Sequence, residues 1–228
     1  MRAMILAAGR GERMRPLTDH CPKPLLQAGG RPLVVWHIER LARAGIRELV
    51  INHAHLGERL EDALGDGARW GVSIAWSRET EALETAGGIA FARHLLGDAP
   101  FLVVNGDIWS DFDFAGAPAI AARLLAHDLD AWCVLVDNPP HNPEGDFGVA
   151  HERLSNDATP RLTFSGIGVY RPRFFAAIAP GARAPLGPML RAAADAGRAG
   201  AQVHRGRWVD VGTPQRLAEL DAQLNTEI

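Results

Sequence analysis

The sequence predicts an α/β fold, a Rossmann-like and mostly parallel sheet with helices on both faces and a small antiparallel patch. In the first half, short apolar runs alternate with segments whose apolar residues recur at helical spacing. The second half is less regular, which favours the antiparallel patch there. The length of 228 residues suits one large domain, and no linker or repeat interrupts it. We therefore expect a single domain, 1–228.

The first half supplies the alternating pattern. We expect strands at 2–6, 48–52, 72–76, 101–105 and 131–136. We expect helices at 33–44, 56–64 and 88–96, the first of which stops at Gly45. This order predicts parallel strands joined by crossover helices.

The second half departs from that alternation. Apolar runs at 147–151 and 163–170 have no expected helix between them, so they indicate the antiparallel patch. A helix at 186–196, short strands at 202–204 and 208–211, and a closing helix at 214–224 follow. Pro214 suits the first position of that last helix. The turn-rich segment 139–145 is expected to be a flexible lid or edge loop.

Composition excludes several classes of protein. The net charge of -3 argues against a nucleic-acid binder, although local basic sites for phosphate remain possible. The N-terminal apolar run 4–8 is too short for a signal peptide or a membrane span. Cys21 and Cys133 show neither metal-ligand spacing nor a disulfide framework. We therefore expect a cytoplasmic protein that binds no membrane.

A glycine-containing loop follows the first expected strand. Gly9 and Gly11 allow backbone conformations in which successive N–H groups form an anion site, and Arg13 and Arg15 add positive charge. A dinucleotide fingerprint needs a third glycine where Met14 stands, and a P-loop needs Gly-Lys-Ser/Thr. The loop alone is compatible with a phosphate site or with a purely structural turn.

Lys23 stands out in an arginine-rich chain. It is the single lysine among 24 basic residues, and it lies between Pro22 and Pro24. Proline restricts its own φ and the residue before it, so we expect the ammonium to be held stiffly near the glycine loop. A compact ammonium beside N–H groups and arginines suits a polyphosphate.

Together these segments resemble a known signature. LAAGRGERMRPLT at 6–18 and PKPL at 22–25 look like the motif of sugar-1-phosphate nucleotidyltransferases. The resemblance implies the nucleotide-diphospho-sugar transferase fold and a reaction in which a sugar phosphate oxygen attacks the α-phosphorus of a nucleoside triphosphate and releases pyrophosphate. It also implies that Arg15 and Lys23 act on the phosphates as catalytic residues. The nucleotide-binding residues implied in this segment are Ala8, Gly9, Gly11, Glu12 and Arg13.

Two aspartates complete the resemblance. Asp107 follows an apolar run in NGD at 105–107, and Asp210 lies in WVDVGTP at 208–214. An isolated aspartate after a strand is more often a turn residue or a cap. Both segments resemble the family's metal motifs in the expected order, which implies that Asp107 and Asp210 bind Mg²⁺ and that Asp107 is catalytic. Mg²⁺ takes hard oxygen ligands and keeps several waters, so two carboxylates suffice.

ETEALETAGG at 79–88 resembles the family's base-contacting loop. The resemblance implies nucleotide contacts from Glu79, Thr85 and Gly87, with a helix beginning after Gly87. Glu84 replaces a glycine that often lies against the base, and Glu79 stands where many relatives have glutamine. A carboxylate accepts hydrogen bonds from uracil N3–H and equally from guanine, so both UTP and GTP stay open. We favour UTP.

The acceptor side is less complete. Gly148 corresponds to a family glycine that touches the sugar, and Ser165 and Gly166 correspond to an Asn-x-Gly-Ile segment, with Ser165 in place of asparagine. Asn105 is implied to lie near the sugar or ribose. The family's Glu-Lys-Pro motif, whose lysine holds the sugar phosphate, is missing, and Arg161 is a candidate replacement.

The sequence also suggests an acceptor. GDFG at 145–148 and FSGIGVY at 164–170 resemble uridylyltransferases that use N-acetylmuramate 1-phosphate in peptidoglycan recycling. A lactyl carboxylate on that sugar favours a nearby arginine. Mannose-1-phosphate guanylyltransferases with a similar frame remain the alternative. A non-catalytic nucleotide-sensing subunit predicts loss of Lys23, Asp107 or Asp210, yet all three are present.

Overall fold

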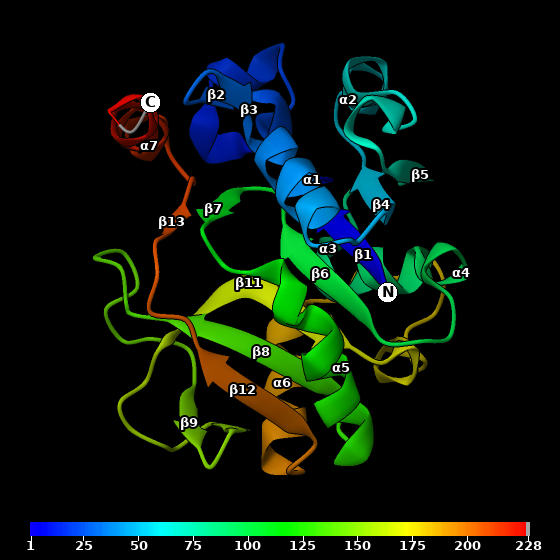
Figure 1. Ribbon diagram of the computed structural model, residues 1–228, viewed down its shortest axis with the longest axis vertical. Helices are drawn as coiled ribbons and strands as arrows, with labels where there is room; N and C mark the ends of the chain where they lie inside the picture. The colour runs from blue at the N-terminus through cyan, green and yellow to red at the C-terminus, as the bar shows by residue number, and fades with distance from the viewer. Residues whose placement is uncertain (227–228) are drawn as a thin grey trace.

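The computed structural model describes residues 1–226, which fold into a central sheet between two layers of helices (Figure 1). Within that range, nine strands form the main sheet in the order β5-β4-β1-β6-β11-β8-β12-β10-β9. The bounds of its strands are Arg2–Leu6 (β1), Glu48–His53 (β4), Ser73–Arg78 (β5), Phe101–Asn105 (β6), Ala131–Val136 (β8), Gly148–Ala150 (β9), Arg153–Ser155 (β10), Thr163–Tyr170 (β11) and Ala199–Val203 (β12).

Helices and two short strand pairs complete the fold. The helices are Leu33–Arg43 (α1), Gly57–Leu64 (α2), Glu84–Phe91 (α3), Arg93–Leu96 (α4), Ala117–Ala126 (α5), Leu186–Asp195 (α6) and Pro214–Asn225 (α7). Two small antiparallel pairs are β2 (Gln27–Ala28) with β3 (Arg31–Pro32) and β7 (Ile108–Ser110) with β13 (Trp208–Asp210). Short 3₁₀ turns occupy Glu12–Met14, Leu17–Asp19, Lys23–Leu25, Ala68–Trp70, Phe114–Gly116 and Pro172–Phe175.

The sheet is mixed because one strand runs against its neighbours. β5, β4, β1 and β6 are parallel, and so are β8 and β12. β11 lies between these two groups and pairs antiparallel with β6 and β8. β10 and β9 then add the antiparallel edge that the second half of the sequence predicts. The Rossmann-like, mostly parallel sheet with a small antiparallel patch is confirmed.

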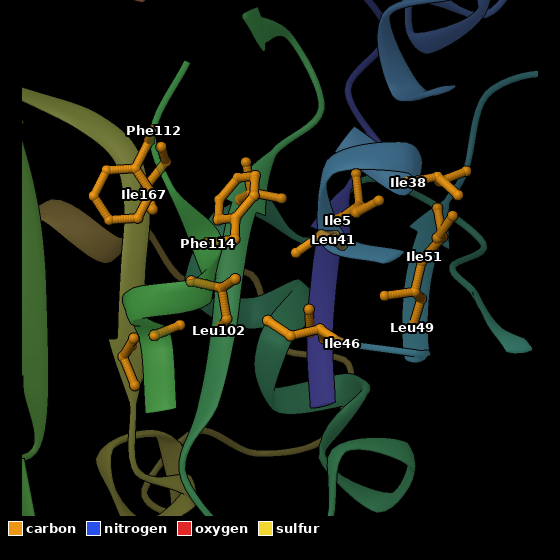
Figure 2. Packing of buried hydrophobic residues seen from close by; sticks show 14 of the residues in the cluster. Ile5, Ile38, Leu41, Ile46, Leu49, Ile51, Leu102, Phe112, Phe114 and Ile167 are labelled. Atoms are coloured by element: carbon orange, nitrogen blue, oxygen red, sulfur yellow. The ribbon is translucent and has the colours of Figure 1, made fainter. Parts of the chain in front are cut away.

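Alternate residues of the central strands supply two cores. Ala3 and Ile5 of β1 face a cluster that α1, α2 and α5 cover, whereas Met4 faces a cluster beneath α3, α4 and α6. Figure 2 shows the first cluster, where Ile5, Leu41 and Leu102 pack between sheet and helices. Burial on both faces explains why these strands appear as continuous apolar runs in the sequence. A third cluster holds α7 against the N-terminal region.

Three sequence expectations need correction. The helix expected at 88–96 begins at Glu84, because Ala184 O accepts hydrogen bonds from Ala86 N and Gly87 N and so satisfies donors of the first turn. α5 was not expected, and the strand expected at 202–204 begins at Ala199.

In residues 1–226 no helix combines the length and apolarity that a bilayer crossing requires.

Candidate active site

The carboxyl ends of β1, β4 and β6 lie side by side and form the floor of a cavity. Leu6 at the end of β1 is in register with Asn52 of β4 and Asn105 of β6. Ligands of open α/β sheets bind at such an edge. The cavity has a volume of about 200 Å³, and the predicted residues on its wall are Ala8, Gly9, Lys23, Thr85, Asn105 and Asp107.

Lys23 and Asp107 meet at this cavity. Lys23 opens a 3₁₀ turn after extended Pro22, so the ammonium extends from a helical turn and not from extended backbone. The Lys23 side chain is 9% exposed, and its Nζ donates to Asp107 Oδ2 at 2.7 Å. Gly11 packs on the stem of this lysine, because a methyl group there would meet Lys23 Cβ at 3.3 Å. Its φ of 69° is also a conformation that glycine adopts without strain.

Asp210 is brought beside Asp107 by a two-strand pairing. Asp210 on β13 is in register with Ile108 of β7, and Val211 N donates to Asp107 O at 2.9 Å. The Asp210 carboxylate accepts a hydrogen bond from Arg216 Nη1 at 2.6 Å and lies 3.0 Å from His141 Nε2. The loop at 139–145 therefore reaches the second metal motif. Two aspartates separated by about a hundred residues in sequence thus occupy neighbouring backbone positions.

The pair of aspartates fits a magnesium ion in donor chemistry. Both carboxylates are hard oxygen ligands, and each is balanced by a cation, Lys23 for Asp107 and Arg216 for Asp210. Groups of three or more His, Cys, Asp or Glu that could enclose a metal do not occur in residues 1–226. Two carboxylates with water and phosphate oxygens are the usual environment of Mg²⁺, which rarely takes an all-protein cage.

The charged residues of the glycine loop lie outside the cavity wall. Arg15 Nε donates to Asp19 Oδ1 at 2.7 Å, and Glu12 lies 3.8 Å from the Arg15 guanidinium. Arg13 is close to the Asp210 segment, because a methyl group on Gly212 would meet Arg13 Nη2 at 3.1 Å and Arg216 Nη2 at 2.5 Å. Arg13 and Arg216 therefore form a basic pair beside Asp210.

Glu79 lies behind the cavity wall. Its carboxylate accepts hydrogen bonds from Asn52 Nδ2 at 2.6 Å and Leu83 N at 3.1 Å, while Asn52 Oδ1 accepts from Ala7 N at 2.9 Å. Burial raises the pKa of Glu79, although its hydrogen bonds oppose the shift. Glu79 thus positions Asn52 and the start of the glycine loop, and Asn52 itself lies on the cavity wall.

The N-terminus of α3 forms the next part of the wall. Thr85 and Glu84 line the cavity, and Glu84 has a φ of 61°. Glycine adopts such a left-handed conformation without strain, whereas other residues rarely adopt it. Gly87 is buried, with its N–H bonded to Ala184 O at 3.1 Å, so it packs α3 against another segment.

A second cavity of about 460 Å³ adjoins the first. Glu84, Thr85 and Asn105 line both cavities. The rest of its wall comes from Asp146, Phe147, Phe164 and Pro185 and from Leu186, Gly187, Leu190 and Arg191 of α6. Apolar and polar residues thus share the wall, as is usual for small-molecule sites.

The predicted acceptor residues shape this second cavity mainly from behind. Ser165 Oγ donates to Val134 O at 2.7 Å and is buried, so the hydroxyl stabilises an irregularity of β11. Gly166 packs on Asn105, because a methyl group there would meet Asn105 Nδ2 at 2.6 Å. Gly148 likewise packs on Ala158, because a methyl group on Gly148 would lie 2.0 Å from the carbonyl oxygen of Ala158. Arg161 binds backbone carbonyls of Asn156 and Asp146.

Sequence reasoning missed Asn52 and Arg191, which line these cavities, and His141 and Arg216, which lie beside Asp210. Asn52 ends a buried parallel strand beside β1, a position whose polar character was the available signal. Arg191, His141 and Arg216 reach their places through tertiary contacts of α6, the 139–145 loop and α7. No local motif marks these three.

Known proteins resemble the whole chain. A family model described as nucleotidyl transferase matches residues 2–227. An N-acetylmuramate alpha-1-phosphate uridylyltransferase of Neisseria meningitidis is 54% identical, with 97% of each chain covered. A protein of the same name from Caulobacter vibrioides is 32% identical over 97% of this chain and 96% of its own. The solved structure of a putative glucose-1-phosphate thymidylyltransferase from Bacillus anthracis in complex with a sucrose shares the fold, with a TM-score of 0.84 at 21% identity over 99% of this chain and 95% of that chain. The chain therefore belongs to the nucleotidyl transferase family.

Proposed function

We propose that this chain transfers the uridylyl group of UTP to N-acetylmuramate 1-phosphate, giving a UDP-sugar and pyrophosphate with Mg²⁺ as cofactor. The observation that carries the proposal is the 54% identity to an N-acetylmuramate alpha-1-phosphate uridylyltransferase along nearly the whole chain. The ion pair of Lys23 with Asp107, and the strand pairing that brings Asp210 beside Asp107, support the same chemistry. Unpaired Cys21 and Cys133 suit a reducing cytoplasm, where we assign the reaction to peptidoglycan recycling.

The proposed mechanism depends on positioning and charge. Asp107 and Asp210 would hold Mg²⁺, which when bound neutralises charge on the phosphate oxygens and helps align them. Lys23, released from its ion pair with Asp107, donates to the α-phosphate while the sugar phosphate oxygen attacks. Arg13 and Arg216 lie where the leaving pyrophosphate needs positive charge. No nucleophile of the protein is required, because the acceptor supplies the attacking oxygen.

The two cavities divide the substrates. The nucleotide occupies the first, where Ala8, Asn52 and Thr85 surround the base and ribose. Glu79 acts on the base only through Asn52 in this proposal, because its carboxylate is already bound. The acceptor sugar occupies the second cavity, and Asn105 lies at the boundary between the two.

Pyrophosphate release tests the proposal. Purified protein with magnesium is mixed with UTP, GTP, CTP or ATP and with N-acetylmuramate, N-acetylglucosamine, glucose or mannose 1-phosphate. We expect the highest kcat/KM with UTP and N-acetylmuramate 1-phosphate. A preference for GTP with mannose 1-phosphate would replace the proposal with the guanylyltransferase alternative. Absence of release with every pair would support a non-catalytic nucleotide sensor.

A further inference from the structure

Arg191 places a positive charge on the wall of the second cavity. It lies on α6, is exposed to solvent, and faces apolar neighbours that include Phe147, Phe164 and Leu190. Its guanidinium carbon is 5.0 Å from the centroid of the Phe147 ring. Stacking on an aromatic ring restricts a guanidinium and leaves its N–H edge available for a ligand.

Arg191 has no carboxylate partner in residues 1–226. Its one hydrogen bond is a long one of 3.4 Å from Nη1 to the backbone oxygen of Asp146. The Asp146 carboxylate instead accepts from Phe164 N at 2.8 Å and from Asn142 Nδ2 at 3.3 Å. The other acidic residue on the wall, Glu84, lies 3.5 Å from Arg183. The acidic groups of the cavity thus have other partners, and the Arg191 guanidinium pairs with neither of them.

The position of Arg191 is remote from the phosphate chemistry. Lys23 and Asp107 line only the first cavity, whereas Arg191 lines only the second. An acceptor whose phosphate lies at the first cavity therefore extends its sugar ring past Asn105 toward Arg191. A guanidinium there meets a substituent of the sugar and not the phosphate groups that react.

We propose that Arg191 binds a carboxylate on the acceptor sugar and so selects an acidic sugar 1-phosphate over its neutral counterpart. This inference rests on the proposed function, in which that carboxylate belongs to the lactyl group of N-acetylmuramate 1-phosphate. Guanidinium and carboxylate match in a two-bond geometry. Arg191 is a specificity residue in this scheme and takes no part in the transfer step.

The test compares acceptors that differ only in charge. Wild-type protein and Arg191→Gln are assayed with UTP and three acceptors: N-acetylmuramate 1-phosphate, its lactyl amide, and N-acetylglucosamine 1-phosphate. We expect Arg191→Gln to lower kcat/KM for the acid by roughly 10- to 100-fold, the range for loss of a charged hydrogen-bonded pair. For the amide and for N-acetylglucosamine 1-phosphate the two proteins should differ by less than about threefold, because the missing charge has no partner there.

A matched control removes a similar arginine elsewhere. Arg69 also stacks on an aromatic ring, Trp70, and donates to a backbone carbonyl, but it lines neither cavity. Arg69→Gln should keep the wild-type preference for the acid. Equal losses of Arg191→Gln on all three acceptors, or no loss on any, would overturn the inference. Wild-type protein that does not use N-acetylmuramate 1-phosphate would instead refute the proposed function, so the two failures are distinguishable.

Discussion

At the residue scale, the Lys23–Asp107 contact makes a specific prediction. Asp107→Asn removes one carboxylate ligand while keeping its shape, so kcat should fall roughly 1000-fold, in line with the several kcal/mol that a bound metal contributes. Asp107 is 40% exposed, so the free energy of unfolding should change little. Steady-state pyrophosphate release and urea unfolding measure the two quantities. Turnover within tenfold of the wild type would contradict the assignment of Asp107 to the metal.

A second residue-scale prediction concerns the Glu79–Asn52–Ala7 chain of hydrogen bonds. Asn52→Ala leaves Ala7 N without a partner and the buried Glu79 with Leu83 N alone, so stability should fall by about 1–3 kcal/mol and KM for UTP should rise. A double-mutant cycle with Glu79→Ala measures the coupling between the two side chains by urea unfolding. Because they form one network, the double variant should lose less than the sum of the single losses. Additive losses would show that the two act independently.

At the element scale, the packing of α3 can be tested by one methyl group. Gly87→Ala would place its Cβ 2.4 Å from the backbone oxygen of Ala182, which no side-chain rotation relieves. We expect a loss of about 1–3 kcal/mol in unfolding free energy, and weaker UTP binding because Thr85 lies in the first turn of the same helix. Gly116→Ala is the matched control, because Gly116 has open space around it and right-handed backbone angles. Gly116→Ala should raise stability by about 0.4–1 kcal/mol. A Gly87→Ala protein as stable as the wild type would contradict the packing argument.

Some strands and helices can be predicted from the sequence, whereas others cannot. Strands such as β1 are predictable because burial on both faces leaves a short apolar run. α5 is harder to predict because half of its residues are alanine, so Ile120 and Leu124 are the large apolar residues that mark its buried face. The start of α3 depends on the carbonyl of Ala184, which is a hundred residues distant in sequence. Such long-range hydrogen bonds leave no local pattern.

At the scale of the whole molecule, the candidate site also combines parts that the sequence predicts with parts that depend on tertiary packing. The motifs around Lys23, Asp107 and Asp210 are local. The parallel strand order brings the end of β6 beside β1, and the antiparallel pairing of β7 with β13 brings Asp210 beside Asp107. Arg191 reaches the second cavity only when α6 has been packed against the sheet. Ala8, Gly9 and Thr85 are the predicted nucleotide-binding residues that line the first cavity, so the sequence predicts part of its wall, whereas the residue that we propose to select the sugar depends on the tertiary arrangement.

The fold also predicts how stability responds to pH. His37 is buried on α1, its Nε2 lies 2.8 Å from Ile108 O, and burial lowers its pKa to about 4 from 6.5. The unfolded chain therefore binds more protons than the folded one between those values, so stability is complete above pH 6.5 and falls as pH decreases toward 4. The shift corresponds to about 3 kcal/mol at most.

Urea unfolding between pH 7 and pH 5 isolates this contribution. The carboxylates whose pKa is lowered, among them Asp130 and Glu61, lose their stabilising charge only at lower pH, and Glu79, whose pKa is raised by burial, acts with the opposite sign. His37→Gln keeps an N–H donor for Ile108 O but cannot titrate. We expect the wild type to lose stability across this range and His37→Gln to lose clearly less. Parallel pH profiles for the two proteins would mean that His37 does not link protonation to the packing of α1 beside the Asp107 segment.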